Sequence, residues 1–165
     1  MRNVSRNPAG AGRRQRGAAV VEFAFAAVIF FTLLTTIMEF GYMFWTNLSM
    51  QHAVREGARY AITGRTDLDP AATKTRYGAV IQRIKDSSMG VYGKVSPQVR
   101  VMVVQNDGSY LELTGATFGN PGQIVVISLD CTHSVLMPFV RPFFTNGDYS
   151  FTVRATMRNE MFPQS

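Results

Sequence analysis

The stretch that decides the fold is residues 13–45, RRQRGAAVVEFAFAAVIFFTLLTTIMEFGYMFW. Within it, residues 18–38 form an apolar run of 21 residues whose one charge is Glu22. An α-helix rises 1.5 Å per residue, so this run would be about 31 Å long, which matches the hydrocarbon core of a bilayer. Its Val, Ile, Leu and Phe residues favour insertion by about 3 to 7 kcal/mol. Glu22 lies one turn inside the run, where an acid costs less than the roughly 3 kcal/mol at mid-bilayer. We therefore predict a transmembrane helix over residues 18–45.

The positive charge of the chain is concentrated before this helix. Five arginines precede residue 18 with no acid among them. From residue 18 onward, 12 Lys and Arg nearly balance 11 Asp and Glu, so the leader carries +5 of the net charge of +6 and the remainder only +1. This distribution argues against a nucleic-acid partner. Because positively charged flanks stay in the cytoplasm, we predict a basic cytoplasmic leader over residues 1–17 and an extracytoplasmic domain over residues 46–165.

A cleaved secretory signal is the competing interpretation of the apolar run. The apolar part of such a signal is about 7–15 residues long and ends at a small-x-small cleavage site. Here the apolar character continues through Trp45, and the small-x-small spacing of residues 24–26 lies inside the run. A helix that stays in the membrane is therefore the better prediction.

The change from basic to apolar falls at Gly17 and Ala18, and Glu22 follows one turn later. This arrangement resembles the processing site of type IV prepilins, where a basic leader ends in Gly and the mature helix has Glu at its fifth position. Cleavage after Gly17 would create an ammonium group at Ala18, about 6 Å from Glu22 along the helix. A carboxylate at low dielectric needs a cationic partner, and this amine, or that of a neighbouring subunit, would supply one and set the axial register. Hydration of Glu22 near the headgroups is the other interpretation, and spacing alone does not decide between the two.

Polar residues recur deeper in the helix, at Thr32, Thr35, Thr36 and Glu39, with Thr46 one heptad beyond Glu39. Such groups can hydrogen-bond to another helix in lipid, so Thr32, Thr36 and Glu39 are candidates for helix–helix contact. In the alternative that we favour, the threonines bond back to their own backbone and Glu39 marks the outer interface.

Residues 46–165 predict a small α+β domain. The first helix should continue past the membrane with a stripe of mostly small residues that allows close packing on a sheet: Ala53, Val54, Gly57, Ala58 and Ala61. Asp69 and Pro70 predict the start of one further helix, which would run to about Asp86. Alternating patterns predict about four mostly antiparallel strands, near residues 99–104, 110–114, 123–135 and 148–160, with hairpin signals at residues 106–108 and 120–122.

Few residues of the domain carry recognisable chemistry. Cys131 is the only cysteine, and we interpret it as a buried strand residue, with an intermolecular bridge as the alternative. His52 and His133 have no metal-ligand or general-base spacing, and only spatial proximity could join Asp130, His133 and Asp148 into a site. We predict no catalysis, no cofactor and no metal. The apolar loop of residues 137–144 either contacts a partner or the outer leaflet, or tucks under the sheet edge, which we favour.

Three segments together resemble one family. RGAAVVEF at residues 16–23, EFG at 39–41 and REGARYA at 55–61 are similar to the TadE-like proteins, which are pseudopilin-like components of tight-adherence (Flp-type) pilus systems. FTVRATMRNE at residues 151–160 is similar to the closing strand of that family. Glu22 and Phe23 occupy the family's Glu-Tyr/Phe pair, and the family motif falls on Arg55, Glu56, Gly57, Ala58 and Arg59.

This resemblance implies a structural role in pilus assembly. It implies cleavage by a prepilin peptidase between Gly17 and Ala18, and contacts with other pilins or pseudopilins and with inner-membrane pilus assembly proteins. It implies a single-pass protein of the bacterial inner membrane with a periplasmic domain, present at the membrane or in the pilus. Major Flp pilins are much shorter, so a minor component fits better. An unprocessed membrane-anchored binding module is the alternative, and a membrane-tethered enzyme is a weaker one because no catalytic signature is present.

Overall fold

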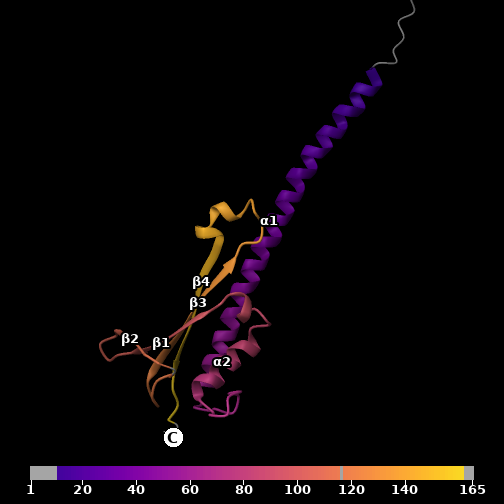
Figure 1. Cartoon of the computed structure of the whole chain (residues 1–165). Helices are drawn as coiled ribbons and strands as arrows, with labels where there is room; N and C mark the ends of the chain where they lie inside the picture. The colour runs from indigo at the N-terminus through magenta and orange to yellow at the C-terminus, as the bar shows by residue number, and fades with distance from the viewer. Residues whose placement is uncertain (1–10, 116, 162–165) are drawn as a thin grey trace, which may run out of the picture. The chain divides into compact units, whose positions relative to one another are not determined.

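The computed structural model describes residues 11–115 and 117–161, with side chains from Gly17 onward (Figure 1). The chain divides after Phe40 into two compact units, which are described separately below. Residues 1–10 of the predicted basic leader lie outside the described residues.

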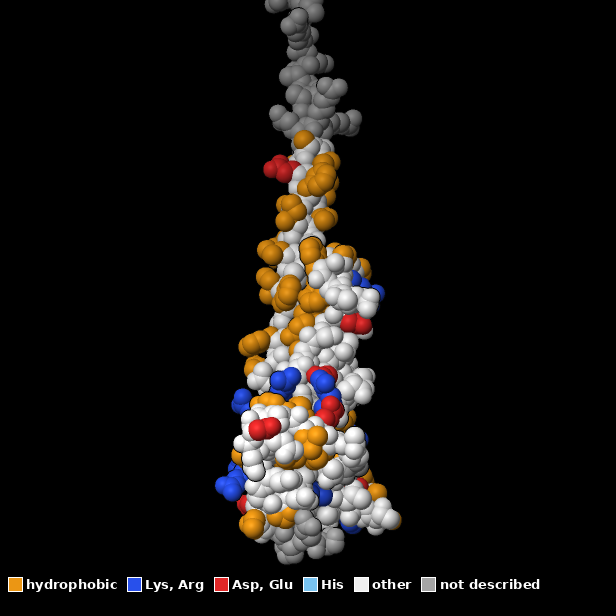
Figure 2. Space-filling model, turned by 90° about the vertical axis from the view of Figure 1, so that its left-hand side faces the viewer, with side chains coloured by type: hydrophobic (Ala, Val, Ile, Leu, Met, Phe, Trp, Pro, Cys, Tyr) orange, Lys and Arg blue, Asp and Glu red, His pale blue; other side chains and the backbone are white. Residues whose placement is uncertain are grey.

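The first unit is the N-terminal part of helix α1, which runs from Ala11 to Ala61. Its apolar side chains are open to the surroundings; Phe23, for example, is 74% exposed and Ile29 is 69% exposed. The face shown in Figure 2 carries hydrophobic side chains along this stretch, whereas most charged side chains lie on the second unit. Within the described part of the chain, α1 is the one helix long and apolar enough to cross a membrane. The predicted N-terminal helix of membrane-spanning character is thus confirmed.

The second unit contains a four-stranded antiparallel sheet. Its strands are β1 (Gln98–Val104), β2 (Tyr110–Glu112), β3 (Ile124–Ser134) and β4 (Asp148–Arg158), in the order β2-β1-β3-β4. The long β3 pairs with β1 and β4 along most of its length. The predicted α+β fold and its sheet are confirmed, with β2 ending two residues earlier than the pattern indicated.

The C-terminal part of α1, from Met50 to Ala61, packs on this sheet through the predicted stripe of small residues. Ala53, Val54 and Ala61 are fully buried, and they share one core with sheet residues such as Ile127 and Leu129. Small side chains let the helix backbone approach the sheet closely. The pattern of small residues therefore identified the packing face correctly.

The second helix begins later than predicted. Helix α2 runs from Arg76 to Ser87, and its N-cap is Thr75, whose hydroxyl accepts from the N–H of Gly78. The carboxylate of Asp69 accepts instead from the N–H of Ala71 (2.9 Å), the N–H of Thr75 (2.8 Å) and the hydroxyl of Thr75 (2.6 Å). These bonds lower the pKa of Asp69, the Thr75 hydroxyl most. Asp69 thus closes a loop before the helix, and the Asp-Pro signal predicted the wrong start.

The expectation that the apolar loop tucks under the sheet edge is correct for only part of it. Val135 and Val140 are buried with Met43 in a second, small core. Leu136 is 62% exposed, Phe139 42% and Phe143 85%. The loop contains two short 3₁₀ turns, η2 (Arg141–Phe143) and η3 (Thr145–Gly147). A third, η1 (Tyr92–Lys94), follows α2.

Candidate functional site

The predicted processing junction lies within α1. Gly17 and Ala18 are both exposed, and a Cβ built on Gly17 would meet no atom within 4 Å outside its own helix backbone. The fold therefore does not require glycine at residue 17. A requirement for a small residue there would come from a partner that binds the junction, such as a peptidase.

Glu22 and Phe23, one turn further on, project from the helix surface. Both side chains are exposed, and among the described side chains Glu22 has no ion-pair partner. A carboxylate in an apolar helix is costly without a cation or water beside it. The described part of the chain thus leaves Glu22 available to a group supplied from outside.

Two threonines in the polar stripe of α1 bond within their own helix. The hydroxyl of Thr35 donates to the carbonyl of Phe31 (2.8 Å), and that of Thr36 to the carbonyl of Thr32 (2.7 Å). Thr36 thus uses its hydroxyl proton without another helix, as the alternative interpretation proposed. Glu39 and Thr46 are 3% and 0% exposed, so both side chains are buried.

The motif of residues 55–59 divides into buried and exposed members. The carboxylate of Glu56 lies 3.0 Å from a guanidinium nitrogen of Arg83 on α2 and 3.5 Å from one of Arg59. The hydrogen bond from Arg83 lowers the pKa of Glu56. A Cβ built on Gly57 would lie 2.3 Å from Cγ1 of Ile84, and Ala58 is 5% exposed. Residues 56–58 therefore hold α1 against α2 and the sheet.

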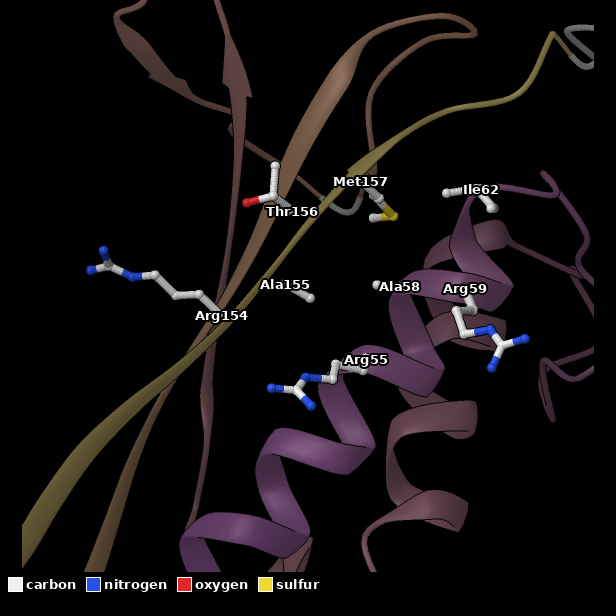
Figure 3. A pocket seen from close by; sticks show the side chains of 8 residues that line it. All are labelled: Arg55, Ala58, Arg59, Ile62, Arg154, Ala155, Thr156 and Met157. Atoms are coloured by element: carbon white, nitrogen blue, oxygen red, sulfur yellow. The ribbon is translucent and has the colours of Figure 1, made fainter.

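Arg55 and Arg59 flank an open groove of about 450 Å³ between the end of α1 and β4. Its apolar lining includes Ala58, Ile62, Ala155 and Met157. Figure 3 shows Arg59 pointing away from Arg55 and Arg154, and the three guanidinium groups lie apart. Nε of Arg154 donates to the hydroxyl of Ser128 (3.3 Å), on the other face of the sheet. The guanidinium groups do not converge, so this groove lacks the geometry of an anion site.

The sheet keeps the candidate chemical residues apart. Asp130 pairs with Arg100 and accepts from the hydroxyl of Thr152, which lowers its pKa most. His133 points to the opposite face of β3, where its ring centroid lies 5.1 Å from that of Tyr42. Asp148 accepts from the hydroxyl of Ser134 (2.7 Å). In the described residues these groups form no nucleophile–base pair.

Metal and thiol chemistry find no support in the described residues either. They contain no group of three or more His, Cys, Asp or Glu placed to hold a metal ion. Cys131 is 1% exposed, and burial raises the pKa of its thiol to about 12. Such a thiol stays protonated and inaccessible, as expected of a buried strand residue. His52 is exposed on α1.

Sequence reasoning missed Arg76, the first residue of α2. Its guanidinium donates to the carbonyls of Ala61 (2.9 Å) and Gly119 (2.9 Å) and to Oδ1 of Asn159 (2.8 Å). Arg76 thus supplies a hydrogen-bond donor to a carbonyl at the end of α1, and it joins this helix end to two segments far away in the sequence. Nothing in the local sequence distinguishes this arginine from an exposed one.

Together these features define a class of protein, namely a small α+β domain carried on one N-terminal apolar helix of membrane-spanning length. The family model of the TadE-like proteins matches residues 17–59, which confirms the resemblance over that segment. The match covers the junction, the apolar helix and the motif of residues 55–59 in one continuous stretch. No curated protein and no solved structure matches the chain.

Proposed function

We propose that the protein is a minor pilin or pseudopilin-like structural component for assembly of a tight-adherence (Flp-type) pilus. The observation that carries this proposal is the TadE-like match at residues 17–59. That segment ends within the part of α1 that packs on the domain, so the matching helix is continuous with the domain's core.

The proposed maturation is cleavage between Gly17 and Ala18 by a prepilin peptidase. The exposed, sterically free junction suits access by such an enzyme. Cleavage would give Ala18 an ammonium group, and Glu22 would lie about 6 Å along the helix axis from it. Pairing of this carboxylate with the amine of a neighbouring subunit would fix the axial register of packed helices, with Phe23 beside the contact.

The proposed topology follows the distribution of charge. The basic leader of residues 1–17 would stay in the cytoplasm, residues 18–45 would cross the bacterial inner membrane, and residues 46–165 would lie in the periplasm. Other pilins or pseudopilins and inner-membrane assembly proteins would be its partners. Thr32, Thr36 and Glu39 remain candidates for helix–helix contact, and the role proposed for the protein is structural, not catalytic.

The replacement Glu22→Ala tests the role of the junction glutamate. We expect normal membrane insertion and normal cleavage but a marked loss of surface pili, because the register contact is gone while the peptidase site is intact. Pili would be counted by electron microscopy in a deletion strain that expresses the variant. Val21→Ala, which changes the exposed neighbour and keeps the carboxylate, is the matched control and should restore piliation. Normal pilus numbers with Glu22→Ala would remove this role and favour an unprocessed binding module.

A further inference from the structure

The loop of residues 135–147 contains the apolar segment 137–144. It lies at one end of the packing between α1 and the sheet. At the other end, the N–H of Glu160 donates to the carbonyl of Ile62 (3.2 Å), next to the start of β3. Near the end of β3, the ring of His133 contacts that of Tyr42. β3 therefore runs antiparallel to this part of α1, and the loop that follows β3 lies beside α1 (Figure 1).

A small core fixes this loop to α1. Met43, Val135 and Val140 are each at most 4% exposed, and Phe144 and Tyr149 pack against them. By helical rise, Met43 lies about 8 Å beyond Met38, where the apolar run ends. A bilayer has a headgroup layer of roughly 5–8 Å on each side of its 30 Å hydrocarbon core. If residues 18–38 span the core, Met43 lies near the headgroups, and the loop that packs on Met43 is within reach of them.

The surface of the loop suits that depth. Leu136, Phe139 and Phe143 are exposed, and Phe44 and Trp45 on α1 are 67% and 41% exposed at the same level of the helix. Arg141 is the one charged residue from 135 to 147, and its sign suits anionic lipid. Aromatic residues are enriched where membrane meets water, whereas an exposed apolar patch in water is unfavourable.

The backbone hydrogen bonds of the loop also suit a poorly hydrated environment. The N–H groups of Val140, Phe143, Phe144 and Gly147 all donate to carbonyls within the loop. Nε of Arg141 donates to the carbonyl of Val135 (2.7 Å), which closes the loop on itself. Lipid cannot satisfy free backbone groups, so a segment that enters the interface must bond internally.

We infer that this loop is a second membrane contact, which places Leu136, Phe139 and Phe143 in the lipid surface on the domain's side of the bilayer. The inference rests on α1 spanning the membrane, and it is independent of the role in pilus assembly. A second copy of the chain is the competing occupant of this surface.

The test uses the full-length chain, whose one tryptophan, Trp45, is a built-in reference. A Trp45→Phe/Phe143→Trp variant moves the fluorophore to the loop at a site that is 85% exposed, so the fold should tolerate it. The protein is reconstituted at low density in phosphatidylcholine–phosphatidylglycerol vesicles with or without lipids brominated on the acyl chains. A Trp45→Phe/Tyr110→Trp variant is the control, because Tyr110 is 65% exposed and pairs with Val104 of β1. The preceding residue of β1 pairs with Val125 of β3, which lies roughly 27 Å along the strand from His133.

We expect brominated lipid to quench the Phe143→Trp variant about as strongly as native Trp45 and to leave the Tyr110→Trp control unquenched. Quenching of Phe143→Trp no greater than that of the control would overturn the inference. A blue shift that brominated lipid does not quench, and that fades as the protein is diluted, would overturn it in favour of contact between copies. Quenching of a Trp45→Phe/Phe25→Trp variant, whose tryptophan lies inside the apolar run at a site that is 70% exposed, reports insertion of α1, so failure of the loop contact is distinguishable from failure of insertion.

Discussion

At the scale of single residues, the family motif is explained mainly by packing. Gly57 is required because the side chain of Ile84 occupies the space that a Cβ would need, and Glu56 is held by Arg83. The sequence located the stripe of small residues, but it could not show which glycine is in close contact with a side chain of another helix. Arg55 is left on the surface beside the groove, and no described contact explains its place in the motif.

Replacing Gly57 by Ala should lower the free energy of unfolding by about 1–3 kcal/mol, because the new methyl group overlaps a fully buried isoleucine. The measurement is thermal unfolding of the full chain in detergent, followed by circular dichroism. Gly41→Ala is the control, since a Cβ there meets nothing within 4 Å, and alanine should leave helix stability unchanged or raise it by up to about 1 kcal/mol.

A double variant tests whether steric overlap with Ile84 causes the loss of stability in Gly57→Ala. Ile84→Ala removes the overlapping atoms, so it should destabilise the Gly57→Ala protein much less than it destabilises the native one. Equal effects in the two backgrounds, or identical melting of Gly57→Ala and Gly41→Ala, would show that close packing does not explain this glycine.

At the scale of elements, sequence periodicity predicted the strands well, whereas the capping signal predicted the start of the second helix less well. The alternating patterns identified β3 and β4 because the side-chain period of a strand is fixed at two, although Val126 and Ser128, on the second face of β3, are buried as well. The start of α2 could not be predicted, since the carboxylate of Asp69 bonds to the backbone and hydroxyl of Thr75 and closes a loop where a helix was expected. The N-cap is Thr75 instead, which the Asp-Pro signal did not indicate.

The contacts of Arg76 depend on tertiary structure in the same way, and they predict a large effect. Arg76→Met should lower the free energy of unfolding by roughly 2–3 kcal/mol, because buried carbonyls at the end of α1 and near Gly119 lose a charged donor. Arg83→Met, on the same helix, removes a pair with Glu56 whose arginine is 41% exposed and should cost little. Equal loss of melting temperature in both variants would contradict this account of Arg76.

At the scale of the whole molecule, the sequence predicted the membrane-spanning character of α1 and the α+β domain, because hydrophobic runs and alternation report burial directly. The anchoring of the loop at Met43 could not be predicted, since it depends on where β3 ends beside α1. The junction at Gly17 and Glu22 is a property of the sequence alone. Both residues are exposed, and neither packs against another element in the described part of the chain.

Processing at that junction is therefore the central claim, and the mass of the mature protein tests it most directly. The full-length protein would be extracted from membranes of cells with and without the prepilin peptidase, and its intact mass and N-terminal sequence determined. We predict a chain that starts at Ala18 only where the peptidase is present. A full-length chain in both strains would contradict the proposal and leave an ordinary membrane anchor.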